Sequence, residues 1–158
     1  MSLTINTTIN GRSISASAEP STSLLDFLRD TLEYKGTKLC CNTGECGACT
    51  IIYNGKPINS CVTMAADAIG AQITTIEGEA DGDKLHPVQQ AFIDTGAVQC
   101  GYCTPGYIIS VKVLLDRTKK PTAEDIEEAV SGNICRCTGY TKIVDAIQLA
   151  ADRMAGRV

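Results

Sequence analysis

Nine cysteines are the residues of this chain whose type and spacing could do chemistry. Eight of them form two sets of four, and the ninth, Cys40, directly precedes the first set. The first set lies in the N-terminal half and the second in the C-terminal half: Cys41, Cys46, Cys49 and Cys61, then Cys100, Cys103, Cys135 and Cys137. Thiolates bind soft metal ions and carry out redox reactions, so either role could explain these residues.

The rest of the composition points to a cytoplasmic protein with reduced thiols. The first residues include no basic region followed by a long apolar segment and no pair of arginines, so we expect no export signal. No stretch reaches the roughly 18 to 20 apolar residues that a membrane-spanning helix needs. In the cytoplasm a disulfide framework is not expected, which leaves metal binding or redox chemistry. The net charge of −4 and the few aromatic side chains argue against nucleic-acid binding.

The first set of cysteines has the ligand spacing of a plant-type [2Fe–2S] site in compressed form. Cys41, Cys46 and Cys49 follow the pattern C-x4-C-x2-C, and Cys61 adds a fourth thiol. Two irons bridged by two sulfides need four thiolates, and the loop glycines Gly44 and Gly47 let backbone N–H groups point at the sulfur atoms. A zinc site would favour two CxxC knuckles, and a thioredoxin-like site would not need Cys41 and Cys61. We therefore interpret this set as an iron–sulfur site.

The second set is less specific in its spacing. Cys100 and Cys103 form a CxxC pair ahead of a predicted helix, and Cys135 and Cys137 form a CxC pair ahead of the last predicted helix. Thiolates at helix N-termini are stabilised by the helix dipole and by free N–H groups. Spacing alone leaves both an iron–sulfur cluster and a structural zinc site open for these four residues.

Cys40 stands outside both sets. Because the side chains of neighbouring residues diverge, Cys40 and Cys41 do not easily bind the same cluster. We expect Cys40 to be a buried small hydrophobe, while an exchange of ligand roles between Cys40 and Cys41 stays open.

The N-terminal half, residues 1–78, predicts a small α+β unit around the first set. Asn10-Gly11 and Asn54-Gly55 each predict a two-residue hairpin, because both turn positions need positive φ angles. A short helix with a serine cap is predicted over residues 24–28, and a last strand over residues 73–76. A unit of this size needs a stabilising element, such as a bound metal, in addition to its own hydrophobic core.

The C-terminal half, residues 79–158, predicts a bundle of four helices. A polar, glycine-containing segment over residues 77–83 is interpreted as the linker. Helices are then predicted to start at Pro87, after Thr104 and after Thr122, where Asp125 completes a capping box. The last helix places Ile143, Ile147 and Ala150 on one face, while the second is apolar on most sides and is expected to be buried.

Three motifs, taken together, are similar to a known family. The segments 36–50, 99–106 and 132–140 resemble, in the same order, those of the xanthine oxidase family of molybdenum hydroxylases. More narrowly, they resemble the separate small iron–sulfur subunit of bacterial carbon monoxide dehydrogenase and of aldehyde and N-heterocycle oxidoreductases. Where that family usually has glycine, this chain has Cys40, which puts the local backbone of the loop in question.

The resemblance implies a fold, a ligand set and partners. It implies an α+β protein with an N-terminal β-grasp, ferredoxin-like domain and a C-terminal four-helix bundle, each carrying one [2Fe–2S] cluster on its four thiolates. It also implies that Gln99 and Cys137 approach a molybdopterin cofactor in a large subunit, and that FAD in a medium subunit accepts the electrons.

No residue pattern in the chain predicts a reaction centre of its own. The sequence has neither a P-loop nor a dinucleotide-binding GxGxxG after a strand. His86 is expected to be a surface or cap residue, and Glu127-Glu128 a solvated helix face. We therefore expect an electron-transfer subunit of a molybdenum hydroxylase complex. A free two-cluster ferredoxin, which would favour a strongly charged docking face, and a zinc-stapled interaction module are the alternatives.

Overall fold

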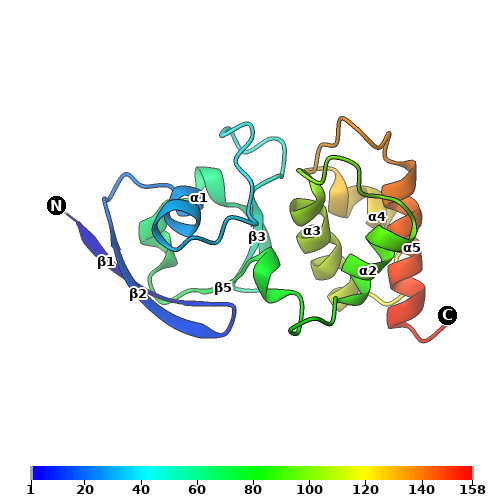
Figure 1. Ribbon diagram of the computed structural model, residues 1–158, viewed down its shortest axis with the longest axis horizontal. Coiled ribbons are helices and arrows are strands. Elements are labelled where there is room, and N and C mark those ends of the chain that lie inside the picture. Colours follow the sequence, from blue (N-terminus) through cyan, green and yellow to red (C-terminus); the bar gives the residue numbers. More distant parts are fainter. Residues whose placement is uncertain (1, 158) are drawn as a thin grey trace.

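The computed structural model describes residues 2–157, which form a five-stranded sheet beside a bundle of helices (Figure 1). The order of strands in the sheet is β2-β1-β5-β3-β4, with β1 and β5 parallel and the other pairs antiparallel. The strands are β1 (Leu3–Ile9), β2 (Arg12–Ala18), β3 (Thr50–Tyr53), β4 (Lys56–Asn59) and β5 (Gln72–Thr74). The helices are α1 (Leu24–Asp26), α2 (Pro87–Asp94), α3 (Thr104–Arg117), α4 (Ala123–Val130) and α5 (Thr141–Met154). The predicted α+β fold is confirmed.

Both predicted hairpins are present. Asn10 and Gly11 join β1 to β2 with φ angles of 51° and 75°, and Asn54 and Gly55 join β3 to β4 with φ angles of 48° and 80°. Two successive residues with positive φ produce a turn whose twist matches that of the flanking strands. The β3–β4 hairpin matters for the first set of thiols, because its two outer ends lead to Cys49 and to Cys61.

The sheet encloses a small core with the helical turn that follows β2. The Ser23 side chain accepts a hydrogen bond from the Asp26 N–H at 3.0 Å and so caps α1 as predicted. The chain then continues into the π-helical turn Phe27–Thr31, so the helical segment extends beyond residue 28, where the predicted helix ended. Its buried Phe27 and Leu28 pack with Ile5, Ile51 and other buried residues of the sheet.

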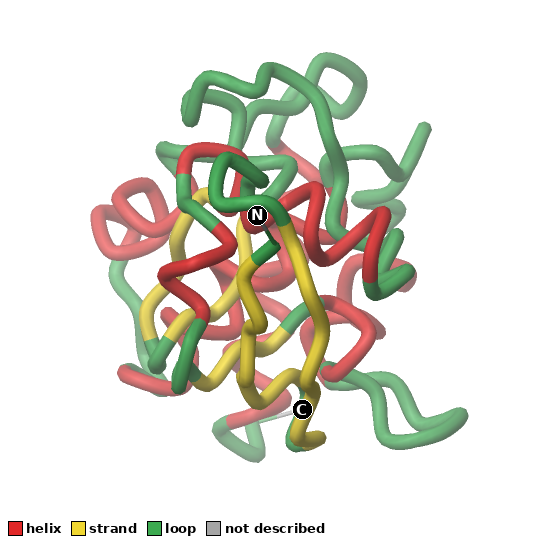
Figure 2. Tube along the Cα trace, turned by 90° about the vertical axis from the view of Figure 1, so that its left-hand side faces the viewer, coloured by secondary structure: helices red, strands yellow, loops and turns green. Residues whose placement is uncertain are grey.

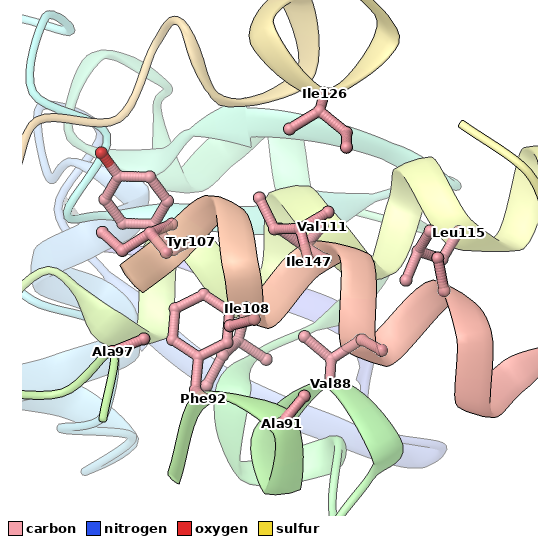
Figure 3. Packing of buried hydrophobic residues seen from close by; sticks show 14 of the residues in the cluster. Val88, Ala91, Phe92, Ala97, Tyr107, Ile108, Val111, Leu115, Ile126 and Ile147 are labelled. Atoms are coloured by element: carbon pink, nitrogen blue, oxygen red, sulfur yellow. The ribbon is translucent and has the colours of Figure 1, made fainter. Parts of the chain in front are cut away.

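The four predicted helices of the second half are also present, and they surround a second core. Pro87 opens α2 and Thr122 caps α4 with a reciprocal capping box to Asp125. The core is built by side chains from all four helices, including Phe92, Ile108 and Ile147 (Figure 3). The helix α3 is buried along most of its length and lies against β3 and β4 on its other side (Figure 1).

The segment between the two cores is held in place rather than free. Glu77 accepts a hydrogen bond from the Gly36 N–H at 2.7 Å, and Ile76 packs against the helical core. Glu79 is buried, and that burial raises the pKa of its carboxyl group. The linker therefore ties the first half to the second through both apolar and polar contacts.

None of the helices within residues 2–157 is long and apolar enough to span a lipid bilayer.

The first prediction concerns the stability that the hairpin residue Asn10 contributes to the sheet. Its amide donates to Thr75 Oγ1 at 3.0 Å and accepts from the Thr75 N–H at 2.9 Å, so it ties the β1–β2 turn to the end of β5. Asn10→Ala leaves these groups unpaired and puts alanine at a positive φ, which lowers the free energy of unfolding by about 1–3 kcal/mol. Denaturant unfolding measures the loss; the exposed Asn6→Ala on β1 serves as the control and is expected to change little.

Candidate metal centres

The segments that carry the cysteines lie together at one end of the molecule. The loop of residues 36–49, the turn before α3 and the turn before α5 all project to the upper end in Figure 1, and the view turned by 90° shows loops gathered at the same end (Figure 2). Strands and helices thus bring these three separate stretches of chain to this end.

The thiols of the first set come together as two pairs. Cys41 and Cys46 hydrogen-bond to each other, and the same holds for Cys49 and Cys61. Hydrogen bonds from Thr43 hold the pKa of Cys41 at about 5, whereas burial and the neighbouring Cys49 raise the pKa of Cys61 to about 11. Cys41 also acts electrostatically on Cys61, so the two pairs lie within reach of one another.

Backbone geometry explains how the loop wraps around these thiols. The φ angles of Gly44 and Gly47 are 82° and 68°, a region that residues with a side chain rarely adopt. The Asn59 amide donates to the Gly44 carbonyl at 2.6 Å and thereby fixes the loop to the end of β4. The Thr43 N–H lies 3.4 Å from Cys41 Sγ, the type of amide–sulfur contact that stabilises a thiolate.

The second set repeats the arrangement of two pairs. Cys100 Sγ and Cys137 Sγ are 3.5 Å apart, and Cys103 hydrogen-bonds to Cys135. Burial works to raise the pKa of Cys135, but hydrogen bonds from the Thr138 side chain and backbone outweigh it and lower the pKa. At Cys103, next to the N-terminus of α3, burial outweighs any effect of the helix and raises the pKa to about 12.

Two pairs of thiols suit a two-iron cluster better than a single metal ion. A tetrahedral zinc ion needs four donors at one centre, whereas each iron of a [2Fe–2S] cluster takes two thiolates. The donor set and its division into pairs therefore fit a [2Fe–2S] cluster at each site.

The expectation for Cys40 was wrong. This residue is exposed rather than buried, and its thiol hydrogen-bonds to Cys46. The loop carries Leu39 outwards as well, and the Tyr102 hydroxyl donates to the Leu39 carbonyl. The reason is local: the loop presents Cys41 and Cys46 to the cluster site at its surface, so the adjoining residue has no core to enter.

The two cluster-binding regions are directly connected by hydrogen bonds. The Ile134 N–H donates to the Cys46 carbonyl at 3.0 Å, and the Asn133 side-chain amide donates to the Gly47 carbonyl at 3.0 Å. Gly106 in α3 approaches the Gly47 carbonyl so closely that no β-carbon fits between them. Asn133 was missed by sequence reasoning; its position two residues before Cys135 was the available signal.

The remaining residues considered in the sequence lie at the surface or cap a helix. Gln99 and Cys137 are both exposed, and Cys100, which follows Gln99, contacts Cys137. His86 caps α2, where its Nδ1 accepts a hydrogen bond from the Val88 N–H at 3.3 Å. Glu127 and Glu128 lie on an exposed face of α4, as expected.

Comparison with known proteins agrees with the two sites. Residues 7–72 match the model of the 2Fe-2S iron-sulfur cluster binding domain, and residues 75–148 match that of the [2Fe-2S] binding domain. The chain is thus an electron-transfer protein with two [2Fe–2S] domains, and the predicted cofactors are confirmed at that level.

Similar proteins and solved structures show to which family of two-cluster electron-transfer proteins the chain belongs. The chain is 48% identical to the nicotinate dehydrogenase small FeS subunit of Eubacterium barkeri, across 97% of this chain and 98% of the relative. It is 46% identical to the xanthine dehydrogenase iron-sulfur-binding subunit of Escherichia coli O157:H7, across 92% of each chain. The structure of quinoline 2-oxidoreductase from Pseudomonas putida 86 superposes with a TM-score of 0.93 and 40% identity, covering 99% of both chains.

The chain belongs to the xanthine oxidase family of molybdenum hydroxylases and matches the small iron–sulfur subunits of that family. It is therefore the electron-transfer component of an oxidoreductase complex with larger partner subunits. In some relatives the same unit is part of a longer chain. The structure of an aldehyde oxidoreductase from Desulfovibrio desulfuricans superposes with a TM-score of 0.94 and 42% identity, and the match covers 98% of this chain but 17% of that one.

The second prediction concerns the close approach of Gly106 to the Gly47 carbonyl, which we expect to forbid a larger side chain at position 106. Alanine normally stabilises a helix interior relative to glycine by up to about 1 kcal/mol. Here the added methyl group overlaps with the Gly47 carbonyl, so we expect Gly106→Ala to destabilise the protein by about 1–3 kcal/mol instead.

Gly132→Ala is the matched control for this substitution. Gly132 lies in the adjoining segment, but nothing would contact its β-carbon and its φ is not positive. Thermal unfolding of the two variants should therefore differ clearly. Equal melting temperatures would contradict the steric account of this interface.

Proposed function

We propose that Cys41, Cys46, Cys49 and Cys61 hold one [2Fe–2S] cluster, and that Cys100, Cys103, Cys135 and Cys137 hold the second. The division of each set into two pairs of thiols is the observation that carries this assignment. A bound [2Fe–2S] cluster supplies reversible one-electron transfer.

The proposal divides the chain into two domains. Residues 1–78 form the ferredoxin-like domain and residues 79–158 the helical domain, each with its own cluster. Two separate hydrophobic cores, one under the sheet and one inside the bundle, support this division. The boundary follows the turn Ile76–Gly78, after the last strand of the sheet.

We place the large, molybdopterin-binding subunit against the helical domain. The exposed Cys137 and Gln99 are the residues we assign to the approach of the molybdopterin, and Cys137 contacts the equally exposed Cys100. Beside this edge, α4 and α5 enclose a groove of about 550 Å³ lined by Val130, Ile134 and other largely apolar side chains. An exposed apolar groove next to a redox site favours a stable protein–protein contact.

The ferredoxin-like domain is then the exit for electrons. Its cysteine loop is exposed at Cys40 and half-exposed at Cys41, and the exposed Leu39 and Val62 lie beside ligands of the first set. We propose that FAD in a medium subunit accepts the electrons at this surface. The chain thus binds partners on two faces and moves electrons between them, while the substrate chemistry takes place in the large subunit.

We also propose that the complex is cytoplasmic. All nine cysteines are free thiols in the structure, and a reducing compartment keeps them available as ligands.

Two cysteine substitutions test the ligand assignment. Cys46→Ser removes a proposed ligand, so the ferredoxin-domain cluster and its electron paramagnetic resonance signal should be lost while the second signal stays. Cys40→Ala is the control, because it removes a neighbouring thiol that we do not assign as a ligand. Iron content and the spectra of the dithionite-reduced complex give the result. Two intact signals in Cys46→Ser, or a lost signal in Cys40→Ala, would contradict the assignment.

The docking face gives a separate prediction. Val144 on α5 lines the groove and is partly exposed, so Val144→Asp places a charge where we expect the large subunit to pack. The variant should lose the large subunit during affinity purification of the complex and keep both clusters. Ile69→Asp, at a more exposed apolar residue of the other domain, should retain it. Retention of the large subunit by Val144→Asp would refute this docking face.

A further inference from the structure

Asn133 uses all of its polar groups although it is almost completely buried, with 5% of its surface exposed. Its side-chain amide donates to the Gly47 carbonyl at 3.0 Å, and its side-chain oxygen accepts from Ser110 Oγ at 2.8 Å. Its backbone carbonyl accepts from the Tyr107 hydroxyl at 2.5 Å, and its N–H donates to Val130 at 2.9 Å. The residue thus connects α3, the end of α4 and the first cysteine loop.

The contact to Gly47 joins the two domains between segments that carry cysteines of both sets. Gly47 lies between the proposed ligands Cys46 and Cys49, and Asn133 lies two residues before Cys135. A β-carbon at Gly47 would overlap with Asn133 and with the Gly132 carbonyl, so the two backbones are in direct contact. Nothing flexible separates the two loops here.

A hydrocarbon side chain could fill this space but could not make the same connection. Within its own domain the Gly47 carbonyl accepts from the Thr50 N–H at 3.1 Å and from Thr50 Oγ1 at 2.7 Å, and Asn133 adds a donor from the other domain. The same amide supplies the acceptor that the Ser110 hydroxyl needs, so one planar group makes both contacts. Ser110 holds the Asn133 amide in the orientation that points its nitrogen at Gly47. The arrangement therefore specifies a position for the loop, in addition to filling the core.

We propose that Asn133 is a positioning residue that fixes the first cysteine loop against the second cysteine turn, and thereby sets the separation and orientation of the two clusters. This inference rests on the ligand assignment of the proposed function. The rate of electron transfer between the two sites depends on that separation, so Asn133 acts on the rate without binding either cluster.

The substitution Asn133→Asp tests the proposal most selectively. Aspartate keeps the shape and the acceptor for Ser110, but it turns an oxygen towards the Gly47 carbonyl in place of the N–H donor. Asn133→Ala removes both contacts. Asn59→Ala is the matched control, because Asn59 makes the same kind of amide contact to a loop carbonyl, that of Gly44, within the ferredoxin-like domain.

The readout is the magnetic interaction between the two clusters in the fully reduced complex, measured as splitting of their electron paramagnetic resonance signals at low temperature. This splitting falls steeply with distance, and a residue that merely stabilises the fold does not change it while both clusters are bound. We expect Asn133→Asp and Asn133→Ala to lose or broaden the splitting and to slow electron transfer between the clusters after rapid reduction. Asn59→Ala should lower the melting temperature and keep the splitting.

The outcomes separate this inference from the ligand assignment. Both clusters present with an unchanged splitting in both Asn133 variants would overturn the positioning role and leave the ligands as proposed. If the unmodified complex lacks two [2Fe–2S] signals, the ligand assignment itself fails. An equal loss of splitting in Asn59→Ala would mean that any loosening of the loop has this effect, which also contradicts a specific role for Asn133.

Discussion

Each cluster site depends on one constraint: four thiolates must meet although they come from separate stretches of chain. In the ferredoxin-like domain, three proposed ligands share one loop and Cys61 arrives after the β3–β4 hairpin. In the helical domain, the turns before α3 and α5 each bring two thiols. This convergence depends on the hairpin, on the helix termini and on the glycines that let the loop turn tightly. Bound metal therefore stabilises the fold in turn, since the ligands are brought together only in the folded chain.

The contact between the domains meets a second requirement, that two redox sites keep a constant separation. The helix α3 belongs to the helical core on one side and lies against β3 on the other. At its N-terminal end, Gly106 and Asn133 hold the Gly47 backbone, and Ile134 donates to the carbonyl of Cys46. The position of one cysteine loop relative to the other is thus defined by the close backbone approach of Gly106, the Ile134 N–H and the short Asn133 side chain, rather than by long side chains.

Local signals explain why most elements could be predicted from the sequence. Asn-Gly pairs require positive φ angles, and both hairpins formed where such pairs occur. Caps at Ser23 and Thr122 marked helix starts correctly, because their side chains satisfy N–H groups of their own first turn. The thiol spacing predicted an iron–sulfur site for the first set, since a cluster needs its ligands at fixed spacings on one short loop, and the ligand assignment itself stays a prediction.

Other features depend on contacts between distant residues and left no local signal. The parallel pairing of β1 with β5 and the role of Asn133 both join segments far apart in the chain. Cys40 was expected in a core because cysteine is usually buried, yet the loop it belongs to lies at the surface. At Gly106, an ordinary helix start in the sequence proved to be a place where two backbones touch.

The most direct test of this account is electron paramagnetic resonance of the dithionite-reduced chain, purified with its natural partner subunits, together with iron and molybdenum analysis. The account predicts two distinct [2Fe–2S] signals and four irons per chain, in a complex that also contains molybdenum. A single signal, or zinc in place of iron at the second set of cysteines, would contradict it.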